Sequence, residues 1–258
     1  MARFSVLAIL LIAGASVAGE QGAPTKLQEG VQYERVEPPV PTVVGSGRIE
    51  VTEYFWYGCP HCNALEPYVV NWLKNKPEDV TFVRIPVAWD KPERIAHARL
   101  FFALQRLGRT DLHGAVFETI HVKGNRLFVA GDDKATLQAQ VKFAEAHGIA
   151  GKDFEAAYAA SSDDVTRANS RAEASHVSGV PSMLVAGKYV TDPGKTGASE
   201  ENMIAIMNGL VELERKRRAA TAAVEVGSNR RGNSGQLAIL ESLTLATSTA
   251  TSGAKDHQ

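Results

Sequence analysis

The feature that most constrains this fold is a close pair of cysteines between two apolar strand patterns. "RIEVTEYFWY" at 48–57 is rich in β-branched and aromatic residues and predicts a buried strand. A helix is expected from about Pro60 to Lys74, because Cys59 suits an N-cap and proline suits the first helical position. "DVTFVRIPVAW" at 79–89 predicts a second buried strand. Strand, helix and strand in this order form a βαβ unit with a parallel strand pair.

The pattern after this unit is helical and then returns to strands. Residues 92–177 carry several segments with helical periodicity and predict an all-helical block. "GVPSMLVAGKYV" then predicts a hairpin with a two-residue turn at Gly187-Lys188, and a last helix should start after Ser199. "EGVQYERV" at 29–36 is expected to be a short edge strand. The outer pieces therefore resemble one domain that is split by a helical insertion.

The two ends of the chain differ from its middle. Residues 1–18 combine a basic start, a short apolar run and small residues before a cut after Ala18, which predicts a secretory signal peptide. The mature protein would then work outside the cytosol, where disulfides persist. Ala, Ser, Thr and Gly make up 22 of residues 219–258, so we expect a low-complexity, mostly disordered tail.

Charge excludes one class of partner. With 28 basic and 29 acidic residues, the net charge of −1 gives no general attraction for nucleic acid or an anionic membrane. We expect no nucleic-acid partner.

Three interpretations of Cys59 and Cys62 compete. A structural bridge would close a very short loop and remove little entropy from the unfolded chain. A zinc site would need two more ligands, and the chain has no further cysteine. A redox dithiol fits best, because the first cysteine lies where the amides of a helix start stabilise a thiolate. His61 between the cysteines can add positive charge.

The combination of motifs resembles a known family. "EYFWYG", "CPHC" and "SGVPSMLVAGKYV" look like the DsbA branch of the thioredoxin-fold oxidoreductases, and the resemblance covers roughly residues 28–215. It implies an α/β, thioredoxin-like fold with an inserted all-helical domain. The divisions would be a signal peptide (1–18), a first thioredoxin-like part (19–91), a helical insertion (92–177), a second thioredoxin-like part (178–218) and the tail (219–258).

The resemblance also implies an activity and its partners. The protein would be a monomeric periplasmic enzyme that donates its Cys59–Cys62 disulfide to unfolded or newly exported proteins with free cysteines. A DsbB-like membrane quinone oxidoreductase would re-oxidise it. No cofactor and no metal are expected. In this mechanism Cys59 is the exposed, reactive sulfur and Cys62 is its buried partner, with Pro60 and His61 between them.

Two further positions carry expectations. By resemblance, Pro181 follows a cis peptide bond, lies beside the disulfide and, with Val180, presents backbone to a substrate strand. Glu53 falls on an apolar strand face, where a carboxylate is out of place unless it is paired or protonated. We expect a raised pKa and a role in moving protons for Cys62. The other interpretation of Glu53 is an ion pair with Arg84 on the next strand.

Two alternative functions remain open from the sequence. The nearer one is a reductase or isomerase on the same fold, although the DsbC-like isomerase class adds an N-terminal dimerisation domain for which few residues are available here. The other is a non-catalytic protein that binds a metal or a peptide through its CxxC motif.

Overall fold

The computed structural model describes residues 27–45, 47–197 and 199–250, with side chains as far as residue 225. The predicted signal peptide and its cleavage after Ala18 therefore lie outside the described residues, as do the last eight residues of the chain, 251–258.

A five-stranded mixed sheet forms the centre of the molecule, with strand order β1-β5-β4-β2-β3. Strands β2 and β3 pair in parallel, and all other neighbours pair antiparallel. The predicted edge strand is present as β1. The strands are β1 (Glu34–Arg35), β2 (Ile49–Phe55), β3 (Val80–Pro86), β4 (Ser182–Val185) and β5 (Tyr189–Thr191).

The helices follow the predicted order. One connects the two parallel strands, a block lies between β3 and β4, and the last ones follow β5. They are α1 (Pro60–Asn75), α2 (Pro92–Arg106), the short 3-10 helix η1 (Thr110–Leu112), α3 (His113–His121), α4 (Asp133–Ala146), α5 (Gly151–Ala159), α6 (Ser162–Ala174), α7 (Pro193–Thr196) and α8 (Glu200–Ala250). The Ser199 hydroxyl accepts a hydrogen bond from the Asn202 amide at 3.2 Å, so the predicted cap of the last helix is formed.

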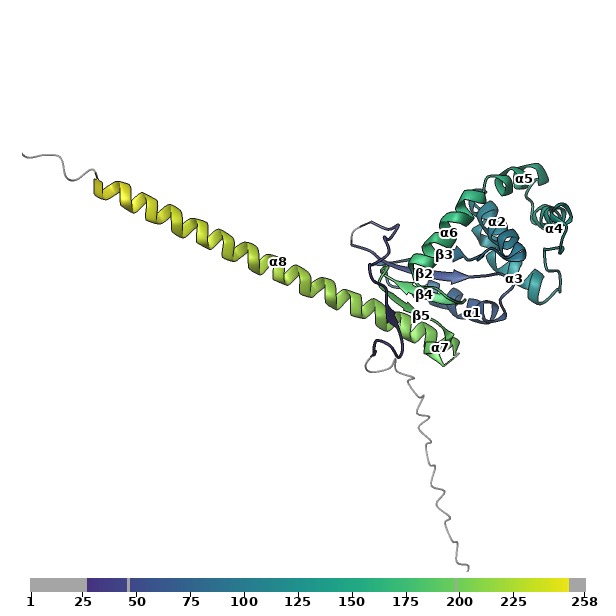
Figure 1. The fold of residues 1–258 in the computed structure, drawn as a ribbon, viewed down its shortest axis with the longest axis horizontal. Coiled ribbons are helices and arrows are strands. Elements are labelled where there is room, and N and C mark those ends of the chain that lie inside the picture. The colour runs from purple at the N-terminus through teal and green to yellow at the C-terminus, as the bar shows by residue number, and fades with distance from the viewer. Residues whose placement is uncertain (1–26, 46, 198, 251–258) are drawn as a thin grey trace, which may run out of the picture.

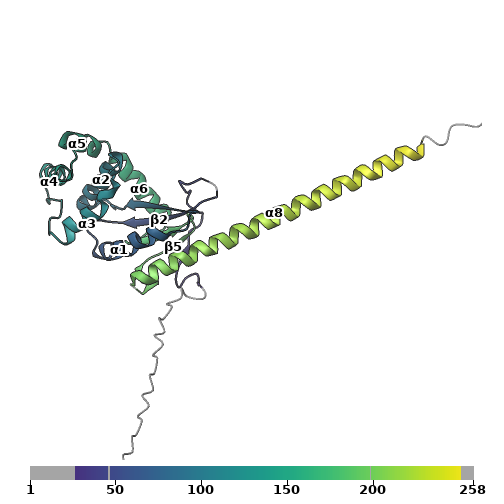
Figure 2. The ribbon, with the colours of Figure 1, turned by 180° about the vertical axis from the view of Figure 1, so that it is seen from behind.

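The helices divide between the two faces of the sheet and one end of it (Figures 1 and 2). Helices α1 and α8 pack on one face through residues such as Val69 and Met207. Helix α6 covers the other face through Ala168 and Ala172. The end of β2 runs into a third cluster, where Phe55 packs with side chains from α2 to α5. The cysteines belong to this third cluster, so they lie at the junction between the sheet and the helical insertion.

The hairpin loop is one residue longer than predicted, because Val185 pairs with Tyr189 and leaves Ala186, Gly187 and Lys188 between the strands. Ala186 and Gly187 both have positive φ (55° and 69°), and the Lys188 amide donates to the Val185 carbonyl at 3.0 Å. A tight hairpin turn of this type needs positive φ at both central positions, which explains why Gly187 takes the second one. The carbonyl oxygen of Val40 would lie 2.0 Å from a Cβ at Gly187, so glycine also admits the close approach of that segment.

The last helix is longer than predicted. We expected it to end near Arg218, before a mostly disordered tail, but α8 continues to Ala250 and projects away from the body (Figure 1). Alanine and leucine favour helix even where no packing surface is available, so the tail's composition does not exclude helix. Over the described residues, no helix combines the length and apolar character that a membrane crossing requires.

Candidate active site

Local geometry places the two cysteines at the start of α1. Cys59 is the N-cap residue with extended backbone, and Pro60 occupies the first helical turn. The Cys59 amide donates to the Trp56 carbonyl at 3.0 Å, which closes a turn between the end of β2 and the helix. Both cysteines are free thiols, and Cys62 is completely buried.

Cys59 has the lowered pKa that was predicted, but its side chain is buried and not exposed as expected. Cys59 is only 7% exposed, because its sulfur lies under Val180, whose carbonyl oxygen is 3.4 Å away. A hydrogen bond from the Cys62 side chain, backbone amides of Cys62 and His61, and the charge of His61 together outweigh burial. They lower the pKa of Cys59 to about 6.

The partner cysteine behaves in the opposite way. Burial raises the pKa of Cys62 well above its ordinary value, and the hydrogen bond to Cys59 and the charges of Cys59 and Glu53 raise it further. At neutral pH one sulfur is therefore a thiolate and the other a thiol that donates to it. A low-pKa thiolate is both a good nucleophile and a good leaving group in disulfide exchange.

Pro181 lies beside this pair, as expected. The Val180–Pro181 peptide bond is cis, and the Val180 carbonyl oxygen lies 3.4 Å from the Cys59 sulfur, where it can accept a hydrogen bond when Cys59 is protonated. A shallow groove adjoins this point, lined by His61, Leu65, Pro181, Pro193, Thr196, Ser199, Glu200 and Met203. The predicted cis proline and the exposed His61 thus share one surface beside Cys59.

Glu53 forms the expected ion pair with Arg84 and has a raised pKa, whereas its role in moving protons for Cys62 stays a prediction. Glu53 is fully buried and accepts from Arg84 Nε at 3.1 Å, so the ion pair forms across the parallel strands. Burial nevertheless raises the pKa of Glu53 to about 7, against the lowering effect of Arg84. Its Oε1 atom has no hydrogen-bond partner among the described residues.

The charge network continues beyond Glu53 into residues that the sequence analysis missed. Arg84 Nη2 also contacts both carboxylate oxygens of Glu66, at 2.9 and 2.8 Å. His113 Nε2 lies 3.5 Å from Glu66 Oε2, and its Nδ1 lies 2.9 Å from the Tyr57 hydroxyl. The available signal was a carboxylate on the buried face of α1, since Glu66 follows Cys62 by one helical turn.

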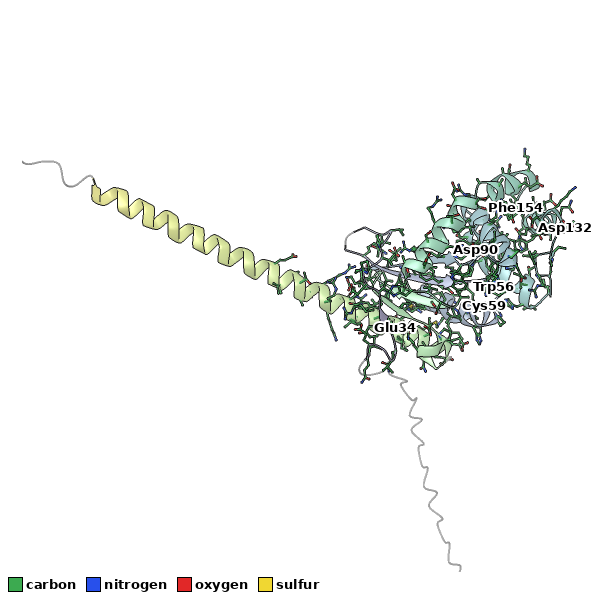
Figure 3. The ribbon with its side chains drawn as sticks, in the orientation of Figure 1. Glu34, Trp56, Cys59, Asp90, Asp132 and Phe154 are labelled. Carbon is green, nitrogen blue, oxygen red and sulfur yellow. The ribbon has the colours of Figure 1, made fainter. Side chains whose placement is uncertain are left out.

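The tryptophans do not line the groove around Cys59. Trp72 is buried in the core below the sheet, and Trp89 packs over Arg94. Trp56 lies close to Cys59 at the junction with the helices (Figure 3), and its ring lies over Gly58. In the described part of the chain, no three His, Cys, Asp or Glu side chains are grouped as metal ligands would be.

The comparisons with known proteins agree with this geometry. The thiol:disulfide interchange protein DsbA of Bordetella parapertussis is 36% identical over 210 residues, covering 80% of this chain and 96% of that protein. DsbA of Azotobacter vinelandii is 37% identical over 218 residues, covering 80% and 97%. The crystal structure of Pseudomonas aeruginosa DsbA, 36% identical, superposes with a TM-score of 0.66 over 74% of this chain and 95% of that one. No protein-family model matches the chain.

Proposed function

The chain belongs to the DsbA family of thiol:disulfide oxidoreductases, and from this premise we propose that Cys59 and Cys62 donate their disulfide to newly exported proteins. The chain is a thiol:disulfide interchange protein with a thioredoxin-like fold and an inserted helical domain. The direction of exchange and the role of each residue follow from the electrostatics of the site. The observation that carries the proposal is the opposite shift of the two cysteine pKa values.

The exchange takes two steps. A substrate thiolate attacks the Cys59 sulfur, the Cys59–Cys62 bond breaks, and Cys62 leaves as a thiolate that takes up a proton. A second substrate thiolate then attacks the substrate sulfur of the mixed disulfide, and Cys59 leaves as a thiolate. Two electrons pass from the substrate dithiol to the enzyme. Because Cys59 is the stabilised leaving group, the second step is fast and the reduced enzyme is favoured.

Pro60 and His61 set the stability of that leaving group. Pro60 occupies the first helical turn without an amide hydrogen, so the amides of His61 and Cys62 are the first ones of the helix that act on the Cys59 thiolate. The His61 amide and side chain both lower the pKa of Cys59. A stable Cys59 thiolate makes the disulfide strongly oxidising.

Glu53 is our candidate for moving the proton that Cys62 takes up. Its charge acts on Cys62, and its pKa of about 7 lets it hold or release a proton near neutral pH. Glu53→Gln keeps the size of the side chain and removes this proton exchange. We expect slower exchange and a changed pH profile, and identical rate and pH dependence would refute the role.

Val180 and Pro181 are proposed to receive the substrate. The Val180 carbonyl faces the Cys59 sulfur, so a peptide strand paired beside it would bring its own cysteine to the site. The shallow surface beside Pro181, which includes Leu65 and Met203, would contact apolar side chains of an unfolded chain.

The cellular context rests on the family. We propose export to the periplasm by residues 1–18 with cleavage after Ala18, and re-oxidation by a DsbB-like membrane partner. The protein is proposed to act as a monomer, divided into the segments that the sequence predicts, except that α8 continues through the predicted boundary at 218.

The redox equilibrium of Cys59–Cys62 in glutathione buffers tests the proposed direction. A disulfide donor stays reduced in buffers that oxidise thioredoxin, and its reduced form is the more stable one towards denaturant. A pair that oxidises as readily as thioredoxin would instead support the reductase or isomerase alternative. Metal retention without exchange activity would support the non-catalytic alternative.

A further inference from the structure

Three histidines of the helical insertion contact Trp56 and Tyr57, the two residues that follow β2. His97 Nδ1 lies 3.0 Å from Trp56 Nε1, His113 Nδ1 lies 2.9 Å from the Tyr57 hydroxyl, and His121 Nε2 lies 2.7 Å from the Tyr57 carbonyl oxygen. We call His97, His113 and His121 the histidine clamp. Helices α2 and α3 supply all three, and the exchange mechanism above uses none of them.

The protonation state of two clamp residues follows from their partners. The Trp56 indole N–H can only donate, so His97 Nδ1 accepts, and the ring proton is on Nε2, which faces the Arg126 carbonyl at 2.8 Å. The neutral His97 ring therefore satisfies both contacts, with Nδ1 as the acceptor and Nε2 as the donor. The His121 Nε2 atom must carry a proton, because the Tyr57 carbonyl can only accept.

His113 joins the clamp to the charge network beside the cysteines. Burial raises the pKa of Tyr57, so its hydroxyl keeps its proton and donates to His113 Nδ1. The other ring nitrogen of His113 then faces the Glu66 carboxylate at 3.5 Å. Glu66 shares Arg84 with Glu53, so the clamp and the acid beneath Cys62 belong to one connected set of contacts.

The clamped residues themselves hold both cysteines. The Trp56 carbonyl accepts from the Cys59 amide at 3.0 Å, and the Trp56 backbone also lowers the pKa of the Cys62 thiol. Only Gly58 separates Tyr57 from Cys59, and the Trp56 ring occupies the space above it, 2.3 Å from the point where a Cβ at residue 58 would lie. A displacement of Trp56 or Tyr57 would therefore move the carbonyl that holds the Cys59 amide and shift Cys59 relative to the helix start.

We propose that the histidine clamp consists of positioning residues, through which the helical insertion fixes the Trp56–Cys59 turn and favours the reduced state of the cysteine pair. The inference rests on the proposed function, in which the reduced enzyme is the stable one. Its physical basis is that a thiolate depends on correctly placed amides, whereas a disulfide does not. Loosening the turn thus weakens the reduced state more than the oxidised state.

The test compares two substitutions at His121, the half-buried member of the clamp. His121→Gln can keep a side-chain N–H donor for the Tyr57 carbonyl, whereas His121→Leu removes it. The matched control is His147→Leu, which removes a histidine of the same insertion that bonds to the Phe143 carbonyl on its own helix. The redox equilibrium with glutathione and the pKa of the Cys59 thiol are measured for the full chain and each variant. Unfolding is followed in both redox states.

The expected result is specific to one variant. In His121→Leu the equilibrium shifts about threefold or more towards the disulfide, as one lost hydrogen bond implies, and the Cys59 pKa rises. His121→Gln and His147→Leu stay within about twofold of the wild type. His97→Leu against His97→Asn, which retains an acceptor near Nδ1, repeats the comparison at a second position of the clamp.

Two results would overturn the inference. Unchanged equilibrium and Cys59 pKa in folded His121→Leu and His97→Leu would mean that the histidines only hold the insertion in place. If these variants destabilise the oxidised and reduced forms equally, the histidines likewise only hold the insertion in place. The redox equilibrium of the wild-type protein tests the proposed function. The change in that equilibrium from wild type to variant tests the histidine clamp, so failure of one proposal can be told from failure of the other.

Discussion

The Cys62 thiol is predicted to stabilise the Cys59 thiolate directly. Its hydrogen bond is the largest favourable contribution to the lowered Cys59 pKa of about 6, ahead of the amides of Cys62 and His61 and the His61 charge. Cys62 can donate because burial keeps it protonated at neutral pH. Cys62→Ala removes this donor and leaves the backbone amide in place, whereas Cys62→Ser supplies a stronger donor at the same position.

The expected size of the effect follows from one hydrogen bond to a charged group. Such a bond contributes about 1.5–3 kcal/mol, and a pKa unit corresponds to about 1.4 kcal/mol. A thiol is a weak donor, so the lower limit applies. We expect the Cys59 pKa in Cys62→Ala to rise by about one unit, from about 6 towards 7. In Cys62→Ser it should remain at or below the wild-type value.

The assay is the ultraviolet absorbance of the thiolate as a function of pH, checked by the pH dependence of alkylation. The stability of the folded protein gives an independent readout. A lowered folded-state pKa stabilises the reduced protein above the unfolded-state pKa of about 8.5, and this stabilisation is lost as pH falls through about 6. In Cys62→Ala the loss should occur about one pH unit higher. Equal Cys59 pKa values in wild type and Cys62→Ala would refute the reasoning and leave the helix start as the main cause.

Three further substitutions test the surroundings of the site. Glu53 has a raised folded-state pKa, so ionisation of its carboxyl group lowers the free energy of unfolding as pH rises through about 7. Glu53→Gln should lose less unfolding free energy over this pH range. The same pH dependence of unfolding in wild type and variant would contradict this. Gly58→Ala places a Cβ 2.3 Å from the Trp56 ring and should cost about 1–3 kcal/mol with a change in tryptophan fluorescence; a wild-type melting temperature would contradict the described packing. Glu214 is fully buried under three basic side chains and its pKa is lowered to about 2, so Glu214→Gln should cost about 2 kcal/mol at neutral pH. That difference should shrink as pH falls from about 4.5 through about 2, because the unfolded chain takes up this proton before the folded protein does, and calorimetry at neutral pH and near pH 2 checks it.

The order of elements was predictable because each carries a local signal. The β-branched run of β2, the proline at the start of α1 and the serine cap of α8 are all statements about a few neighbouring residues. The position of Cys59 at the helix start follows from the same local rules, and so does the direction of its pKa shift. These features need no knowledge of what packs against them.

Other features depend on distant residues and were missed. Cys59 was expected to be exposed, but Val180, more than a hundred residues later in the chain, covers its sulfur. The hairpin loop also includes Ala186, and Gly187 within it lies where the Val40 carbonyl approaches too closely for a Cβ. Neither contact leaves a trace in the local pattern of the sequence.

The histidine clamp shows how such a contact could be anticipated once the fold is known. "WY" directly after β2 presents an indole N–H, a phenol hydroxyl and a carbonyl that no neighbouring strand pairs with, and the helical insertion covers this segment. Buried polar atoms need hydrogen-bond partners. The insertion must therefore offer one acceptor for the indole N–H, one for the hydroxyl, and a donor for the carbonyl. Histidine supplies either role, and His113, Phe117 and His121 recur at four-residue intervals along α3, so they lie on one side of it. Periodicity alone assigns that side to the core, and only the polar atoms of Trp56 and Tyr57 explain why two of its members are imidazoles.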